Sequence, residues 1–224
     1  MISRRRGALV VASVVLALSS CADNGGGRAG PTATTTTSTT VPAAPRVLVL
    51  GDSNLFESRF VVDEALREAG MEPTVLGVPS YGLKDLIFWF EQLSVLLDSD
   101  PDVVVVGLGT NDTSVAANVE KFPRRLDLMM EELGDRPVVW ITHVDDRPAA
   151  PASAGRAINA AIRAAPDRWP NLTVLDFTLV MASDPTVLSA DTLHFTPSGR
   201  VVYAQKIAEA VEAQFRILGT LKDT

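Results

Sequence analysis

The sequence predicts an α/β fold, a flavodoxin-like three-layer α/β/α sandwich built around a five-stranded parallel sheet. After residue 45, short β-branched runs alternate with longer segments of helical period, which is typical of a parallel sheet covered by helices. The run Val103–Val106 is apolar at every position, as expected of a central strand buried on both faces. Hydrophobic residues make up 46% of the 224 residues, enough for one sizeable core.

Five strands are expected from these β-branched runs. They are predicted at Val47–Leu50, Thr74–Gly77, Val103–Gly107, Val138–Thr142 and Thr173–Asp176. Right-handed crossovers between parallel strands require a covering segment between one strand and the next. Because ligand sites of such sheets lie beyond the carboxyl ends of the strands, the residues that follow each strand are the first candidates for chemistry.

The segments between the strands predict helices. After the second strand, apolar residues recur at three- and four-residue spacing, as one buried helix face requires. These residues are Leu83, Leu86, Ile87, Phe90, Leu93 and Leu97. Further helices are predicted at Val61–Ala69, Asn118–Leu133, Ala157–Ala165 and Ser198–Phe215. Tyr81 and Trp89 are interpreted as aromatic packing residues, with contact to substrate as the alternative.

The N-terminal segment predicts export and membrane anchoring. Three arginines at residues 4–6 precede the 12-residue apolar run Gly7–Leu18, which is shorter than the roughly 20 residues of a membrane-spanning helix. This is the layout of a signal peptide over residues 1–20. Leu18-Ser19-Ser20-Cys21 resembles the bacterial lipobox, which implies acylation of Cys21 and a lipid-anchored, extracytoplasmic protein. The alternative is an ordinary signal peptide cut nearby, with Cys21 left as a thiol.

Residues 21–45 are expected to form a flexible tether that begins with the lipidated cysteine. From Ala22 to Pro45 the chain is mainly Gly, Thr, Ser, Pro and Ala, so it cannot offset the entropy lost on folding. A flexible chain of this length spans roughly 25–30 Å. Residues 46–224 are then expected to form a single folded domain, and no intrachain disulfide can form because Cys21 is the only cysteine.

The charge balance argues against a nucleic-acid partner. The formal net charge is −7. Without the three arginines of the signal segment, 17 basic residues face 27 acidic ones, which gives −10. An acidic chain of this kind lacks the excess of positive charge that binds phosphate backbones.

A serine follows the first strand directly, in Gly51-Asp52-Ser53-Asn54. Glycine allows a sharp turn, and backbone N–H groups near a helix start can stabilise the negative charge that develops on an attacked carbonyl oxygen. Alone the tripeptide is weak evidence, because such a turn more often uses Ser or Asp as a helix N-cap. Asp52 is interpreted as a buried helper of the Ser53 turn, with a second catalytic carboxylate as the alternative.

A second polar segment, Gly107-Leu108-Gly109-Thr110-Asn111-Asp112, follows the third strand. Asn111 can aim an amide N–H at the same edge of the sheet, although Asn and Asp also favour turns and helix caps. The segment is not a phosphate loop, which needs Gly-Lys-Ser/Thr, nor a dinucleotide fingerprint, which needs a third glycine where Asp112 stands.

The third segment is Asp191-Thr192-Leu193-His194, near the C-terminus. A carboxylate three residues before a histidine can accept from its Nδ1–H and fix the tautomer, which leaves Nε2 free to take a proton from serine. A lone histidine in a loop is more often structural. The order Ser, Asp, His on an α/β sheet nevertheless favours a catalytic triad of Ser53, Asp191 and His194.

Together these three segments resemble three of the four sequence blocks of the SGNH/GDSL hydrolase family, and their order and spacing agree from residue 46 to about residue 216. The resemblance implies a serine hydrolase in which Ser53 is the nucleophile, His194 the general base and Asp191 its orienting partner. It also implies that the backbone N–H of Ser53 and the side chain of Asn111 stabilise the oxyanion.

The remaining family block supplies a further oxyanion donor from a glycine after the second strand. Gly77 and Gly82 compete for this role, and either can be a plain turn residue. We favour Gly82 because it lies just before the amphipathic helix, where its N–H can point into the pocket.

Two other residues are candidates for the pocket. Asn54 departs from the family pattern, in which leucine or isoleucine is common at this position, and so can alter the pocket edge. His143 follows the fourth strand and can line the pocket, with a strand-end residue as the alternative. Beside Asp145 and Asp146 it lacks a recognisable ligand spacing, so no metal is expected.

We therefore expect an extracytoplasmic esterase that hydrolyses short-chain or O-acetyl esters through an acyl-enzyme, without a cofactor. The expected location favours glycans or lipids of the cell envelope as substrates. One alternative is an O-acyltransferase that passes the acyl group to a sugar hydroxyl. Another is a surface binding protein without turnover, against which the complete set of site residues argues. The oligomeric state stays open.

Overall fold

A computed structural model describes residues 43–145, 147, 150, 151, 153–217 and 219 of the chain. The expected signal peptide, Cys21, most of the tether and Asp146 lie outside the described residues. No helix in the part that is described has the length and apolar character needed to cross a membrane.

Five parallel strands form the central sheet, in the order β2-β1-β3-β4-β5. The strands are β1 (Arg46–Gly51), β2 (Glu72–Gly77), β3 (Val103–Gly107), β4 (Val138–Ile141) and β5 (Leu172–Leu175). This confirms the predicted α/β fold with its five-stranded parallel sheet. Each strand lies within two residues of its predicted bounds. The central strands β1, β3 and β4 consist largely of continuous apolar runs because they are buried on both faces.

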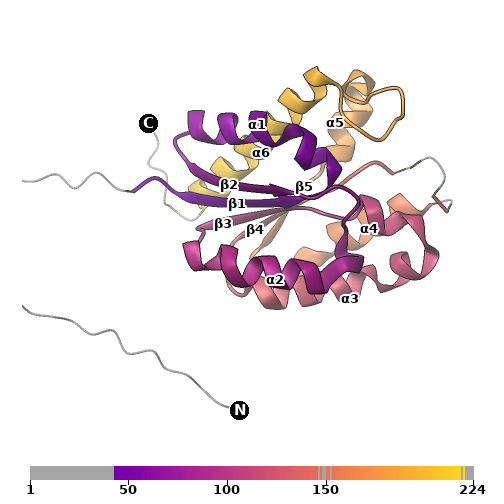
Figure 1. Cartoon of the computed structure of the whole chain (residues 1–224), viewed down its shortest axis with the longest axis horizontal. Coiled ribbons are helices and arrows are strands. Elements are labelled where there is room, and N and C mark those ends of the chain that lie inside the picture. The colour runs from indigo at the N-terminus through magenta and orange to yellow at the C-terminus, as the bar shows by residue number, and fades with distance from the viewer. Residues whose placement is uncertain (1–42, 146, 148–149, 152, 218, 220–224) are drawn as a thin grey trace, which may run out of the picture. The chain divides into compact units, whose positions relative to one another are not determined.

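Helices cover both faces of the sheet (Figure 1). The α-helices are α1 (Ser53–Glu68), α2 (Leu86–Leu96), α3 (Ala116–Leu133), α4 (Ala154–Arg163), α5 (Phe177–Ser183) and α6 (Pro197–Ile217). Helices α1, α5 and α6 cover one face, and α2, α3 and α4 cover the other. Alternate residues of β1 divide between the two cores, with Val47 and Val49 facing α1 and α6, and Leu48 and Leu50 facing α2 to α4.

Helix α1 begins at Ser53, so the predicted start at Val61 is wrong. The Asp52 carboxylate accepts a hydrogen bond from the Asn54 N–H at 3.0 Å, and the Asp52 carbonyl accepts from the Phe56 N–H at 2.9 Å. An N-cap of this kind satisfies N–H groups that have no partner within the helix. The first two turns carry mainly polar residues, which hid their helical period.

Two further expectations about the helices need correction. Ile87 is 79% exposed and does not belong to the buried face of α2, whereas Trp89 is fully buried there. A short 3-10 turn over Leu83–Asp85 precedes α2, and this turn changes which residues of the helix face the sheet. Helix α4 begins three residues earlier than predicted, and α5 was not predicted because its seven residues are too few for a clear helical period.

Register places three glycines side by side at the carboxyl ends of the central strands. Gly51 of β1 pairs with Gly77 of β2 and with Gly107 of β3. A Cβ atom on Gly51 would lie 2.7 Å from the Leu55 Cβ, and one on Gly77 would lie 2.3 Å from the Phe56 nitrogen. Gly51 and Gly77 therefore let α1 pack tightly against the sheet. The segments that follow these strands emerge together at one edge.

Candidate active site

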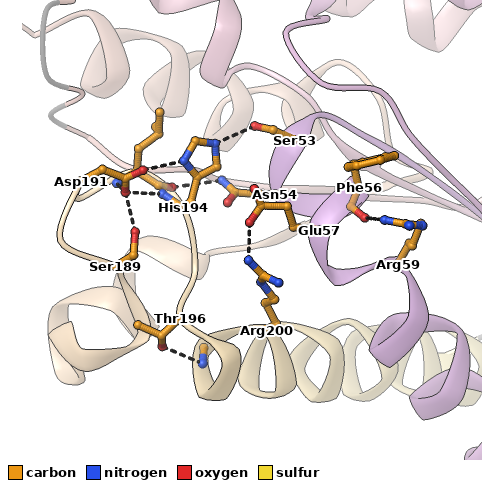
Figure 2. A network of polar contacts seen from close by, with 12 residues as sticks. Ser53, Asn54, Phe56, Glu57, Arg59, Ser189, Asp191, His194, Thr196 and Arg200 are labelled. Carbon is orange, nitrogen blue, oxygen red and sulfur yellow. Dashed lines mark hydrogen bonds and ion pairs between the residues drawn. The ribbon is translucent and has the colours of Figure 1, made fainter.

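The serine, histidine and aspartate singled out from the sequence lie together at this edge (Figure 2). Ser53 is the first residue of α1, and its Oγ lies 3.1 Å from Nε2 of His194. Nδ1 of His194 lies 2.6 Å from Oδ2 of Asp191. Because a carboxylate can only accept, Nδ1 carries the proton, and Nε2 is left as the acceptor for the Ser53 hydroxyl.

The loop that carries Asp191 and His194 is held by its own hydrogen bonds. Oδ1 of Asp191 accepts from the Ser189 hydroxyl at 2.6 Å and from the backbone N–H groups of Leu193 and His194 at 2.9 Å each. These donors, with Ser189 first and the His194 ring next, hold the pKa of Asp191 far below its usual range. The carboxylate stays ionised and orients the imidazole.

Two polar contacts fasten this loop and the following helix to α1 (Figure 2). The Asn54 side-chain amide donates to the Leu193 carbonyl at 3.2 Å. On the next turn of α1, Glu57 pairs with Arg200 of α6, with Nη2 and Oε2 separated by 2.5 Å. These contacts hold the segment that bears the serine next to the segment that bears the histidine, although Ser53 and His194 are 141 residues apart in the chain.

Asn111 lies in a 3-10 turn, Thr110–Ser114, directly beyond β3. One N–H of its side-chain amide donates to the Tyr81 carbonyl at 3.0 Å. An amide nitrogen has two N–H groups, so the second is available to a ligand. The backbone N–H of Ser53, at the start of α1, also has no partner within the helix. The role of both groups as oxyanion donors stays a prediction.

Of the two competing glycines, Gly77 is a packing residue beneath α1. Gly82 lies in the loop after β2, as its predicted role requires, but its N–H donates to Oδ2 of Asp85 at 3.0 Å. The Asp85 carboxylate must therefore turn away before Gly82 can donate to an oxyanion. The role of Gly82 in the oxyanion hole stays a prediction.

Asp112 holds the loop after β2 in place, a role that was not predicted from the sequence. Its side chain is fully buried, and its two carboxylate oxygens accept from the Leu83 N–H at 2.8 Å and the Lys84 N–H at 2.7 Å. Nη1 of Arg125 lies 3.7 Å from Oδ1 of Asp112. Burial raises the pKa of Asp112 to about 6 although these donors oppose the shift. The only sequence signal was the Asn-Asp pair, which equally predicts a helix cap.

The remaining candidates, Asn54 and His143, line a small cavity beside Asp52. Its volume of about 20 Å³ is enough for one water molecule and too small for an acyl group. His143 Nδ1 donates to the Val144 carbonyl, while Nε2 is buried. Burial lowers the pKa of His143 to about 4, so the ring is neutral at pH 7.

Asp52 is buried beneath the serine turn. One oxygen caps α1 through the Asn54 N–H, as described above, and the other has no hydrogen-bond partner in the described part of the chain. Burial raises the pKa of Asp52 to about 6, against the effect of the Asn54 N–H. This geometry fits the interpretation of Asp52 as a helper of the Ser53 turn.

Comparisons with known proteins bear on the family and the fold of the chain. The model of the GDSL-like lipase/acylhydrolase family matches residues 49–201. A lipase/acylhydrolase from Enterococcus faecalis is 24% identical with a TM-score of 0.66, and the match covers 76% of this chain and 96% of that one. No curated protein sequence matches the chain.

Two further structures share the fold at lower identity. A psychrotrophic esterase from Pseudoalteromonas sp. is 14% identical with a TM-score of 0.61, over 76% of this chain and 98% of that one. The C-terminal catalytic domain of peptidoglycan O-acetyltransferase A from Streptococcus pneumoniae is 18% identical with a TM-score of 0.59, over 79% of this chain and 95% of that one. At such identities the likeness shows a shared fold.

Proposed function

Because the chain belongs to the GDSL-like lipase/acylhydrolase family, and is thus a serine ester hydrolase, we propose that it cleaves short-chain or O-acetyl esters outside the cytoplasm. Ser53, His194 and Asp191 form the catalytic triad of this proposal. The observation that carries it is the continuous chain of contacts from the Ser53 hydroxyl to His194 at 3.1 Å and from His194 to Asp191 at 2.6 Å.

In this mechanism the Ser53 oxygen attacks the ester carbonyl while Nε2 of His194 takes the hydroxyl proton. The negative charge on the former carbonyl oxygen is stabilised by the Ser53 N–H and the free amide N–H of Asn111. Gly82 adds a third donor once Asp85 has turned away. The intermediate then collapses, the C–O bond to the alcohol breaks, and His194 protonates the leaving oxygen. Water repeats the sequence on the acyl-serine and releases the acid.

The nucleophile assignment is tested with a fluorophosphonate probe and p-nitrophenyl acetate. The wild-type protein should be labelled at Ser53 and should hydrolyse the ester, and Ser53→Ala should abolish both. Ser94→Ala, which removes an exposed hydroxyl on α2, is the matched control and should retain both. Wild-type turnover in Ser53→Ala would reject the assigned nucleophile, and absence of labelling in the wild type would favour a binding protein without turnover.

A transferase is the second candidate, because the fold is shared with the catalytic domain of a peptidoglycan O-acetyltransferase. In that case a sugar hydroxyl would replace water in the second step. Incubation with an acetyl donor and a sugar acceptor separates the two: an O-acyltransferase yields the acetylated sugar, whereas an esterase yields mainly free acetate. Glycans or lipids of the cell envelope would be the natural substrates in either case.

The location part of the proposal rests on the sequence up to Cys21. Labelled palmitate fed to the native host should appear on the protein, and Cys21→Ala should remove the label and release the protein from the membrane fraction. Cys21 is the only cysteine, so no other thiol can carry the label. Continued labelling of the variant would contradict the anchor.

A further inference from the structure

A groove of about 230 Å³ lies beside the catalytic loop. Its apolar lining includes Val144, Met181 and Leu188, and its polar lining consists of Asp145, Thr178 and Thr192. Thr192 belongs to the loop that carries the proposed Asp191 and His194. Val144 and Met181 also line the small cavity beside Asp52. The groove therefore borders both the small cavity beside Asp52 and the loop that carries the proposed histidine.

Asp145 is held in place on the wall of this groove. Oδ1 accepts from the side-chain amide of Asn159 at 2.8 Å. Asn159 is fully buried and also binds the backbone N–H of His143 at 3.1 Å and its carbonyl at 2.6 Å. Oδ2 of Asp145 makes no hydrogen bond within the described residues. The carboxylate is thus preorganised, with one oxygen committed and one available to a ligand.

The close packing of α4 adds to this rigidity. A Cβ atom on Gly155 would lie 2.2 Å from the Asp145 carbonyl oxygen and 2.5 Å from that of Val144. The segment Val144–Asp145 therefore rests directly on the backbone of α4. A wall fixed by both Asn159 and Gly155 can select a ligand by its hydrogen-bonding groups.

The position of the groove assigns it to the alcohol part of the ester. His194 must protonate the leaving oxygen, so the alcohol departs on the histidine side of the reacting carbon. The carbonyl oxygen faces the other way, towards the N–H groups of Ser53 and Asn111. Thr192 precedes His194 by two residues, which places the groove on the side where the alcohol leaves.

The lining indicates what kind of alcohol fits. The volume is below the roughly 300 Å³ at which pockets for drug-sized ligands begin, so a single ring is accommodated. Apolar side chains can pack against the C–H face of a sugar ring, while Oδ2 of Asp145 accepts from a ring hydroxyl in a charge-assisted hydrogen bond. A purely aliphatic alcohol would desolvate this carboxylate without replacing its partners.

Building on the proposed esterase function, we propose that this groove binds a sugar-like, polyhydroxylated alcohol, and that Asp145 determines specificity by accepting a hydroxyl hydrogen. The substrate class is then an ester of a monosaccharide unit, either free or within a glycan.

The test compares three acetate esters. Acetylated methyl glucoside offers hydroxyls, cyclohexylmethyl acetate has a ring without hydroxyls, and ethyl acetate leaves the groove empty. In Asp145→Asn, Oδ1 still accepts from Asn159 but the charge is lost. Since a hydrogen bond to a charged group contributes about 1.5–3 kcal/mol, kcat/KM for the glucoside ester should fall about tenfold or more, mainly through KM. Ethyl acetate hydrolysis should change less than twofold.

Three further variants complete the experiment. Ala182→Trp fills the groove from an exposed position on α5 and should remove the preference for the glucoside ester, whereas Ala182→Ser should keep it. Asp98→Asn neutralises an exposed carboxylate before β3, at the opposite edge of the sheet, and should leave all three rates unchanged.

Three outcomes would overturn the inference. One is an unchanged kcat/KM for the glucoside ester in Asp145→Asn. The second is a wild-type preference for cyclohexylmethyl acetate that Asp145→Asn strengthens. The third is an Ala182→Trp variant that still prefers the glucoside ester. In each case hydrolysis of ethyl acetate by the wild type would leave the proposed function intact. Failure of the wild type on every ester would instead count against the proposed function.

Discussion

Gly82→Ala tests the contact between the loop after β2, which contains Gly82, and the buried carboxylate of Asp112. A Cβ atom at this position would lie 2.3 Å from Oδ2 of Asp112 and 3.0 Å from its Cγ. The φ angle of Gly82 is −148°, which any residue adopts, so the variant introduces no backbone strain of its own. The whole effect must come from the collision with Asp112.

Asp112 cannot move aside without loss, because both of its oxygens hold backbone N–H groups. Overpacking of a well-packed interior costs about 1–3 kcal/mol. Displacing Oδ2 also breaks its bond to the Leu83 N–H, a hydrogen bond to a charged group that contributes about 1.5–3 kcal/mol. We therefore expect the free energy of unfolding to fall by about 3–5 kcal/mol, a large part of the 5–15 kcal/mol typical of a domain.

Urea unfolding of the wild type, Gly82→Ala, Asp112→Ala and the double variant measures this effect. The collision disappears when Asp112 is shortened, so the double variant should be more stable than the sum of the single effects predicts, by at least about 1 kcal/mol. The slope with denaturant should not change. A loss below about 1 kcal/mol in Gly82→Ala, or strict additivity of the two substitutions, would refute the reasoning.

Two other predictions follow from buried polar groups. The pKa values of Asp52 and Asp112 are both raised to about 6, so between pH 4 and pH 6 each of these carboxyls binds more protons in the folded protein than in the unfolded one. Each therefore lowers the free energy of unfolding by on the order of 2 kcal/mol as the pH rises through this interval. His143, whose pKa burial lowers to about 4, acts in the opposite direction over the same interval by a similar amount, so the net decrease should be on the order of 2 kcal/mol. Asp176, whose pKa Arg163 lowers to about 2, acts below this interval. Urea titrations at pH 4, 5 and 6 should show a smaller decrease in the free energy of unfolding for Asp52→Asn than for the wild type. An unchanged decrease would contradict the raised pKa of Asp52. Asn159→Ala removes the three hydrogen bonds that Asn159 makes with His143 and Asp145, at about 1 kcal/mol each. It should lower Tm by about 6–12 °C in calorimetry. A decrease below about 3 °C would show that the loop after β4 does not depend on these bonds.

The sequence predicted the strands well because their residues report burial directly. A run such as Val103–Val106 has no reading other than a buried segment, and the short length favours a strand. The Gly51–Asn54 and Gly107–Asp112 motifs were placed at the carboxyl edge by the same logic, since each follows a strand directly, whereas the Asp191–His194 segment was assigned from the order Ser, Asp, His. The register that brings Gly51, Gly77 and Gly107 level explains why that placement held.

The missed features depend on contacts between distant residues. The start of α1 was hidden because the polar residues Ser53, Asn54 and Glu57 face the catalytic loop and α6, not the apolar core. The hydrogen bonds that Asp112 accepts from Leu83 and Lys84 span 29 and 28 residues, respectively, and no local pattern marks such a pairing. The groove likewise combines segments after β4, from α5 and from the catalytic loop, which only the folded chain brings together.

The proposed catalytic pair is open to solvent, since half of the Asp191 side chain and 30% of that of His194 are exposed. An ester attached to something much larger than the enzyme can therefore reach Ser53 at the rim, without threading through a tunnel or waiting for a cover to lift. The contact between the two side chains is 2.6 Å long, well within the screening length of about 8 Å at physiological ionic strength, so salt should leave it intact. The exposed rim should therefore accept a bulky ester over a wide range of salt concentrations.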